Sequence, residues 1–381
     1  MYIRLLEKQI LSVLGLKKAI VVYGPRQAGK TTLATKIAEA QGRYLYLNCD
    51  EPDVRAALTE KNSSELKRLL GDHTFVVIDE AQRVPNIGLT LKIIVDNKLT
   101  DQVLATGSSS FELANRINEP LTGRKIVFTL LPLNYLELSP SLSSIERQRL
   151  INELAVYGSY PGIVNAVAGS EKRMLLKELT DSTLYKDILE FQRIRNPDKI
   201  RDLLRALAYQ NGGEVSYSEL GQQLGIDRQT VESYVNLLEQ SFIVYRLPPL
   251  TRNPRKEISR LKKIYFFDNG VRNSLINRFE DFNEHPDRGS LWESWALGER
   301  LKTHLSSKDP RQHYFWRLKS GAEIDLVEEH RGVLHGYEYK LGEKKASVPE
   351  SWGTMYPGST WSVVRPSTFD EDGISDVVLA K

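Results

Sequence analysis

The sequence predicts an α/β protein whose N-terminal part is built on a parallel sheet. From residue 20 to about 130, short apolar runs alternate with longer stretches at helical spacing. This alternation is typical of parallel strands that are covered by helices. A length of 381 residues leaves room for two or three domains, each with a core of its own.

The composition is that of an ordinary folded protein. Hydrophobic residues make up 41% of the chain and charged residues 27%, and 25 Gly with 16 Pro are too few for a collagen-like or low-complexity chain. The net charge of +3 is too small to indicate a nucleic-acid partner by itself. Only local clusters of charge can therefore point to a partner.

Two features predict a cytoplasmic location. Cys49 is the sole cysteine, which excludes an internal disulfide framework and a cysteine-rich zinc site and fits a reducing compartment. We expect it to be a small residue at the end of a strand. The first 16 residues include Arg4, Glu7 and Lys8, so they fit an amphipathic helix and not a signal peptide. No apolar run reaches the roughly 20 residues that a membrane span needs.

The strongest motif lies between the first predicted strand and the helix that follows it. Gly24, four residues, then Gly29, Lys30 and Thr31 form the spacing of a phosphate-binding loop. The glycines allow a tight turn whose N–H groups and helix N-terminus bind phosphate oxygens. Lys30 is expected to reach the β and γ phosphates and Thr31 to ligate Mg²⁺. The alternative is a glycine-rich turn without a ligand.

Acidic residues at the end of a second strand support a nucleotide site. The apolar run that begins at Phe75 ends in Asp79 and Glu80. Asp79 can hold Mg²⁺ through water, and Glu80 is placed to polarise an attacking water, which favours hydrolysis over binding alone. The predicted ligands are therefore ATP and Mg²⁺. The predicted nucleotide-binding residues are Gly24, Pro25, Arg26, Gln27, Ala28, Gly29, Lys30, Thr31, Thr32, Asp79 and Ser108.

The region after the third strand offers residues that could respond to the γ-phosphate. Ser108 ends the strand that begins at Val103, and ordinary strand-end serines are the alternative to a sensing role. Arg116 and Arg124 follow. In an oligomer either arginine can stabilise the charge of the transferred phosphoryl group across a subunit boundary. We favour Arg124 as this arginine finger, with a surface cation as the simpler interpretation.

Several motifs together resemble a prokaryotic group of AAA+-type P-loop ATPases that carry a C-terminal domain of unknown function. They are GPRQAGKTT, FVVIDEAQ, ATGSSS, LTGRKIVFTLLPLNYLEL, YGSYPGIVN, the segment from Ser218 to Leu250, YFFDNGVRN, EIDLV and GYEYK. The resemblance spans nearly the whole chain. It implies ATP hydrolysis, a winged helix after the ATPase and a C-terminal region similar to the restriction-endonuclease fold.

Residues 216 to 240 predict a helix-turn-helix unit independently of that resemblance. Ser216 and Glu219 have the spacing of a capping box, Gly225 makes a turn, and Asp227 can cap a second helix. Such a second helix enters the major groove of DNA, with Arg228, Gln229 and Ser233 on its solvent face.

A basic segment follows the second helix. A predicted strand runs from Phe242 to Arg246, and from Arg246 to Lys263 the chain contains seven cations and one acid. As the wing of a winged helix it would neutralise phosphates with little base specificity. Protein contact and a solvated charged face are the alternatives. The predicted DNA-binding residues are Arg228, Gln229, Ser233, Arg252, Arg255 and Lys256.

Strands near the C-terminus place two acids and a lysine in a nuclease-like pattern. Glu338 and Lys340 share one face of a strand, and Asp325 lies on the preceding strand. Two carboxylates can hold a metal ion that activates water. Glu293 falls on the apolar stripe of a helix, where a carboxylate needs a partner. The set resembles restriction-endonuclease-like nucleases, and a structural network of paired charges is the alternative. The six histidines show no metal-ligand spacing.

Four domains and two functions follow from these features. We expect an AAA+-type ATPase core over 1–139, a helical lid or linker over 140–210, a winged helix over 211–263 and a restriction-endonuclease-like domain over 264–381. The first hypothesis is a homo-oligomeric ATPase, with a hexamer as one form, that binds, remodels or translocates DNA and cleaves it with a metal. The second is an ATP-gated switch whose nuclease-like domain binds DNA or protein without cutting.

Overall fold

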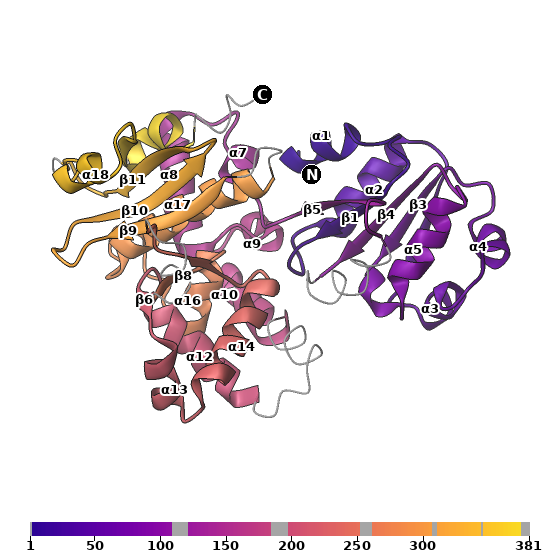
Figure 1. Ribbon diagram of the computed structural model, residues 1–381, viewed down its shortest axis with the longest axis horizontal. Helices are drawn as coiled ribbons and strands as arrows, with labels where there is room; N and C mark the ends of the chain where they lie inside the picture. Colours follow the sequence, from indigo (N-terminus) through magenta and orange to yellow (C-terminus); the bar gives the residue numbers. More distant parts are fainter. Residues whose placement is uncertain are drawn as a thin grey trace. The chain divides into compact units, whose positions relative to one another are not determined.

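The computed structural model describes residues 2–108, 121–183, 197–251, 261–306, 311–343 and 346–374 (Figure 1). The chain divides into two compact units, Met1–Leu133 with Gln240–Phe242, and Asn134–Glu239 with Ile243–Lys381. Within the described ranges, no helix has both the length and the apolar composition of a membrane span.

The first unit is built on a five-stranded sheet whose strands are all parallel, as the alternating pattern predicts. Its strand order is β2-β3-β4-β1-β5. The strands are β1 (Ala19–Tyr23), β2 (Tyr44–Asn48), β3 (Phe75–Asp79), β4 (Gln102–Gly107) and β5 (Lys125–Thr129). The helices are α1 (Leu5–Leu11), α2 (Lys30–Ala40), α3 (Pro52–Leu58), α4 (Ser63–Leu70) and α5 (Ile87–Asp96), with a short 3-10 turn, η1 (Ala81–Arg83).

Successive residues of β1 point to opposite faces of this sheet and so belong to two separate cores. Ile20 and Val22 pack with Leu6 and Ile10 of α1 and with residues of α2. Ala19, Val21 and Tyr23 instead pack with residues of α3, α4 and α5. All five residues of β1 are buried, which explains why the strand is a continuous apolar run without alternation.

The order of the strands determines where a ligand site can form. The chain runs from β1 to β2 on one side of β1, while β5 pairs with β1 on the other side. In parallel α/β sheets, ligands bind beyond the carboxyl ends of the strands at such a change of direction. The predicted loop after β1 and the predicted acids at the end of β3 both lie at this edge.

The second unit begins with helices, as expected for residues 140–210. Helix α8 ends at Tyr157 before Gly158, and α12 begins at Pro197. The helices are α7 (Tyr135–Leu138), α8 (Ser144–Tyr157), α9 (Pro161–Asn165), α10 (Gly169–Glu178), α12 (Pro197–Tyr209), α13 (Tyr217–Leu224), α14 (Arg228–Gln240), α16 (Asn269–Ile276), α17 (Arg288–Leu305) and α18 (Glu350–Met355), with a π turn, η2 (Leu179–Thr183).

Helices α13 and α14 form the predicted pair. Ser216 caps α13 by accepting from the Glu219 N–H, Gly225 ends it in the left-handed conformation, and Asp227 accepts from the Thr230 N–H. Val231, Val235 and Leu238 of α14 are buried. A three-stranded antiparallel sheet accompanies the pair, with β8 (Lys262–Phe266) between β6 (Glu214–Val215) and β7 (Val244–Leu247). The strand predicted from Phe242 begins two residues later, because Phe242 has a left-handed φ of 58°.

The C-terminal part of this unit contains a four-stranded sheet in the order β12-β11-β10-β9. The strands are β9 (Gln312–Arg317), β10 (Glu323–His330), β11 (Val333–Tyr339) and β12 (Thr360–Val364), followed by the turns η3 (Pro366–Thr368) and η4 (Phe369–Gly373). Phe315 and Trp316 of β9 are buried and belong to the core of this unit. Leu305, in the last turn of α17, is 46% exposed.

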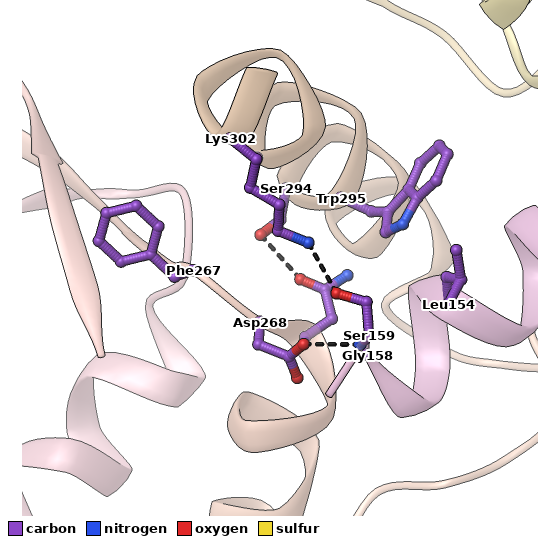
Figure 2. A pocket seen from close by; sticks show the side chains of 10 residues that line it. Leu154, Gly158, Ser159, Phe267, Asp268, Ser294, Trp295 and Lys302 are labelled. Carbon is purple, nitrogen blue, oxygen red and sulfur yellow. Dashed lines mark hydrogen bonds between the residues drawn. The ribbon is translucent and has the colours of Figure 1, made fainter. Parts of the chain in front are cut away.

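The motifs YGSYPGIVN and YFFDNGVRN meet around a small cavity between α8, α16 and α17 (Figure 2). Asp268 accepts from the Ser159 N–H at 2.7 Å, and Lys302 donates to the Ser159 hydroxyl at 2.8 Å. Asn269 donates to the carbonyl oxygens of Ala155 and Leu291. Lys302 also pairs with Glu299 at 2.7 Å, so it acts here as a cation and donor. These buried polar groups lock the three helices together, and the space between them is about that of one water molecule.

Candidate functional site

The loop from Gly24 to Gly29 has a conformation that only glycine fits at its two ends. At Gly24 the φ angle is 155°, and a Cβ atom would lie 1.9 Å from the carbonyl oxygen of Leu130. Gly29 has a φ angle of 94° and caps the N-terminus of α2. Both glycines of the motif are thus required by the backbone, which turns sharply before the helix begins.

Lys30 is the first residue of α2 and is buried. Its ammonium group donates to the carbonyl oxygens of Gly24 at 3.0 Å and Pro25 at 2.8 Å. The cation therefore lies over the loop itself. Phosphate oxygens on the loop would be within reach of the same ammonium group.

Asp79 brings the end of β3 together with three hydroxyl groups. Its carboxylate accepts from Thr31 at 2.8 Å, from Tyr46 at 2.7 Å and from Thr106. The hydroxyl of Thr31 and the carboxylate of Asp79 are hard oxygen donors of the kind that Mg²⁺ prefers. The residues present therefore fit the predicted metal.

Glu80 is held in a left-handed conformation, with a φ angle of 51°. Its backbone N–H donates to the Thr106 hydroxyl at 3.2 Å. Gln82 donates to the Glu80 carboxylate at 2.5 Å and to the Ser108 hydroxyl at 3.1 Å. A non-glycine residue in this conformation costs of order 1–3 kcal/mol, and such costs concentrate at functional sites. The network ties Glu80 and Ser108 to the same edge of the sheet.

Two residues of this site could not be assigned to it from the sequence. Arg4, which directly precedes α1, donates to the carbonyl oxygens of Ala28 at 2.8 Å and Leu131 at 2.6 Å, so it stabilises the phosphate loop. Tyr46 is the second, through its hydrogen bond to Asp79. A lone arginine in an apolar N-terminal segment was a weak signal for the first. Nothing in the apolar run of β2 indicated the second.

The other residues considered for the nucleotide site differ in how exposed their side chains are. Arg124 is 41% exposed at its side chain and pairs with Asp96 at 2.5 Å. Arg116 is outside the described residues. Cys49 is buried directly after β2, as expected, and burial raises the pKa of its thiol to about 12, so it is not a nucleophile at neutral pH.

The structure corrects part of the predicted basic segment. The guanidinium of Arg246 donates to one carboxylate oxygen of Glu239, and the other oxygen accepts from the Arg246 backbone N–H at 3.0 Å. Lys263 is buried and pairs with Glu323 at 2.6 Å. These two cations are therefore committed to internal ion pairs. Arg228, Gln229 and Ser233 are exposed on α14, as predicted. Arg252, Arg255 and Lys256 lie outside the described residues.

The predicted nuclease-like residues gather where α17 meets β8, β10 and β11. Asp325 accepts from the Tyr339 N–H at 2.9 Å, Glu338 pairs with Lys340 at 2.5 Å, and Tyr265 donates to Glu293 at 2.7 Å. Lys263 lies 3.8 Å from Glu293. Among the described residues, these acids do not form a set of three whose ligand atoms all lie within 4.8 Å of one another. To bind one ion jointly, these acids would have to move closer to one another.

Mutual repulsion and burial change the proton affinity of these acids. Burial, followed by the charge of Asp325, raises the pKa of Glu293 to about 7. Burial also raises the pKa of Asp325 and of Glu338. Groups of neighbouring acids with raised pKa values are common at metal-binding and catalytic sites, and they also occur in structural networks.

Replacing Glu293 by Gln should change how stability depends on pH. In the folded chain Glu293 keeps its proton up to about pH 7, whereas the unfolded side chain loses it near pH 4.5. Its contribution to stability is therefore lost as pH rises through 7. The wild type loses this contribution as pH rises, and the variant has none to lose. The unfolding free energy of the variant, compared with that of the wild type at the same pH, should therefore be more favourable at pH 8 than at pH 5 by roughly 1–3 kcal/mol. Urea unfolding at both pH values measures this, and equal shifts at both would contradict it.

Comparison with known proteins supports the fold of the first unit. Residues 16–139 match the family described as AAA domain. The five-stranded parallel sheet of this unit, with the phosphate loop after β1, fits the α/β fold of a P-loop ATPase. Beyond this domain, residues 148–281 and 288–351 match two families described as domains of unknown function, DUF8612 and DUF4143.

Similarity to other proteins extends beyond residues 16–139. An uncharacterized protein of Mycobacterium tuberculosis is 27% identical over 326 residues, which are 84% of this chain and 70% of the relative. An uncharacterized protein of Methanocaldococcus jannaschii is 28% identical over 252 residues, or 60% of this chain and 56% of the relative. Among solved structures, the Walker-type ATPase Paby2304 of Pyrococcus abyssi has a TM-score of 0.46 and 18% identity, and the match covers 72% of this chain and 96% of that one.

Proposed function

We propose that this protein is an ATPase that uses Mg²⁺ and couples ATP hydrolysis to the binding or remodelling of DNA. The observation that carries the first part is the 2.8 Å hydrogen bond between Thr31 and Asp79, which unites the phosphate loop with the acidic strand end. The presence of Glu80 beside this pair favours hydrolysis over binding alone.

Each residue of the site has a chemical role in this proposal. Lys30 moves from the loop carbonyls to the β and γ phosphate oxygens, and the loop amides bind the remaining oxygens. Thr31 and Asp79 would hold Mg²⁺, which would neutralise negative charge on the phosphate oxygens. Glu80 accepts a proton from the attacking water and is kept in place by Gln82. Arg4 maintains the shape of the loop through its hydrogen bonds to the carbonyl oxygens of Ala28 and Leu131.

The proposal extends to a homo-oligomer in which Arg124 acts on the site of a second copy. This arginine is exposed and its ion pair with Asp96 is a surface pair, which is worth little energy. Arg124 can therefore leave Asp96 and contact a phosphoryl group at little cost in free energy. A hexamer is the oligomer that we propose.

DNA is the proposed partner of the segment from α13 to β8. Helices α13 and α14 and the antiparallel strands β7 and β8 follow one another in the order of a winged helix. Arg228 stands at the start of α14, where helices of this type contact DNA. The basic residues Arg252, Arg255 and Lys256 follow β7 in the position of the wing.

Arg228→Ala is expected to weaken DNA binding in a way that depends on salt. Loss of one phosphate contact should lower the slope of log affinity against log salt by about one. Fluorescence anisotropy with duplex DNA at several salt concentrations measures the slope. Arg68→Ala, at an exposed position of α4 in the AAA-type domain, is the matched control and should leave the slope unchanged. An unchanged slope for Arg228→Ala would remove α14 from the DNA interface.

Metal-dependent cleavage by the C-terminal domain is a further part of the proposal. Asp325, Glu338 and Glu293 would hold the ion, and Lys340 would stabilise the charge on the phosphate. The 2.5 Å ion pair between Lys340 and Glu338 favours the second hypothesis, a switch whose nuclease-like domain does not cut. Nicking of supercoiled DNA with Mg²⁺ or Mn²⁺ decides between them, because only cleavage predicts a product that Lys340→Ala abolishes.

The ATPase rate in the presence of single-stranded, duplex and branched DNA tests whether the protein hydrolyses ATP and whether DNA is its partner. The proposal predicts phosphate release that at least one of these DNAs accelerates. Phosphate release that no DNA changes would leave the ATPase intact and remove DNA as its partner.

A further inference from the structure

Two histidines and a glutamate from three elements of the second unit meet near the C-terminal end of α17. Among the residues that the structure describes, His304, His313 and Glu328 are the one group of three His, Cys, Asp or Glu side chains whose ligand atoms all lie within 4.8 Å of one another. His304 is in the last turn of α17, and His313 and Glu328 face each other across strands β9 and β10. This cluster is separate from the carboxylates around Asp325.

The three ligand atoms have separations that suit a metal ion. His304 Nδ1 lies 2.8 Å from His313 Nε2, and the Glu328 Oε1 atom lies 3.6 Å from the first nitrogen and 3.9 Å from the second. A triangle with these sides has a point about 2.0 Å from all three atoms. Zinc bonds to imidazole nitrogen and carboxylate oxygen have lengths of about 2.0–2.2 Å.

The surrounding protein holds these side chains in fixed positions. Glu328 is 1% exposed, and Arg300 donates to its two oxygens at 2.7 and 2.8 Å, with Arg311 donating at 2.9 Å. Arg300 also donates to the Tyr337 hydroxyl at 2.7 Å. Ligands that are positioned by a second set of hydrogen bonds lose little freedom when they bind a metal. Backbone pairing of His313 with Glu328 adds to this order.

The two imidazoles already face each other through the nitrogens that would bind the ion. In the chain as it stands, one ring donates a hydrogen bond to the other between His304 Nδ1 and His313 Nε2. A metal ion would take the place of that hydrogen bond and would use both nitrogen lone pairs.

We propose that His304, His313 and Glu328 form a binding site for a divalent transition metal of the zinc type. Two nitrogens and one oxygen suit Zn²⁺, Co²⁺, Ni²⁺ or Cu²⁺, whereas Mg²⁺ prefers oxygen ligands and retains its waters. The ion would connect the end of α17 to strands β9 and β10. Because Arg300 and Arg311 both face Glu328, their two positive charges exceed the single negative charge of the ligands, and we expect weaker binding than at an all-anionic zinc site.

Titration of the full-length protein with Co²⁺, followed by visible absorption, tests the proposal. The wild type should bind one Co²⁺ per chain with the absorption bands of a nitrogen-containing site, and an excess of Mg²⁺ should not displace it. His313→Asn should lower the affinity roughly tenfold or more. His313 is the ligand to change because its side chain is 13% exposed, whereas that of His304 is 3% exposed.

Two control variants separate this site from others. His335→Asn removes a histidine from the neighbouring strand β11, and Glu329→Gln removes a carboxylate of β10 that belongs to neither cluster. Both should bind Co²⁺ as the wild type does. Circular dichroism establishes that each variant is folded, and Zn²⁺ should raise the melting temperature of the wild type but not of His313→Asn. Absence of Co²⁺ binding by the wild type, or equal binding by folded His313→Asn, would overturn the proposal.

Discussion

Glu80→Gln should lower the rate of ATP hydrolysis by about two orders of magnitude or more while ATP binding persists. The amide cannot accept a proton from water, but it has the shape of the carboxylate and can still contact Gln82. The loop, Lys30 and the Thr31–Asp79 pair are unchanged, so the affinity for nucleotide should remain close to that of the wild type. Phosphate release and equilibrium binding of a fluorescent ATP analogue measure the two properties separately.

Glu39→Gln is the matched control for this experiment. Glu39 is an exposed glutamate of α2, outside the contacts of the site. Its replacement removes the same charge from the same unit and should leave both turnover and binding unchanged. If Glu80→Gln hydrolyses ATP as fast as the control, Glu80 is not the base.

Gly158→Ala should destabilise the second unit severely. At this glycine the φ angle is 73°, and a Cβ atom would lie 1.9 Å from the Asp268 carboxylate that accepts from the Ser159 N–H. The carboxylate is buried and also caps α16, so it cannot move aside without losing hydrogen bonds. We expect the unfolding free energy to fall by about 3 kcal/mol or more. Denaturant unfolding followed by tryptophan fluorescence measures the loss, because all five tryptophans of the chain lie between Trp292 and Trp361.

Gly162→Ala, four residues further on, provides the control for Gly158→Ala. A Cβ atom at Gly162 meets no atom within 4 Å, and the residue lies in α9. Because alanine favours helix over glycine, the control should be neutral or more stable by up to about 1 kcal/mol. Similar unfolding free energies for the two variants would show that the contact between Gly158 and Asp268 does not limit stability.

The sequence was sufficient where local spacing determines structure. The phosphate loop, the capped helices α13 and α14 and the apolar strand before Asp79 depend on residues within a few positions of one another. Each carries a turn, a cap or a period that can be recognised without a partner. These elements therefore appear where the patterns predict them.

Contacts between distant residues could not be predicted in the same way. Arg4 reaches Leu131 across the unit, and Tyr46 reaches Asp79 from a neighbouring strand. Lys263 belonged by composition to a basic segment, but its pairing with Glu323 depends on how β8 lies in the fold. His304 and His313 show no ligand spacing along the chain, and only the helix and the strand bring their nitrogens together.

The central claim is that the loop after β1 and the acids at the end of β3 form a working ATP site. Phosphate release from ATP by the purified full-length protein, with and without Mg²⁺, tests it most directly when Lys30→Ala is measured beside the wild type. We predict turnover by the wild type that requires Mg²⁺ and is lost in Lys30→Ala. Equal phosphate release from both proteins, or none from the wild type under any of these conditions, would contradict the claim.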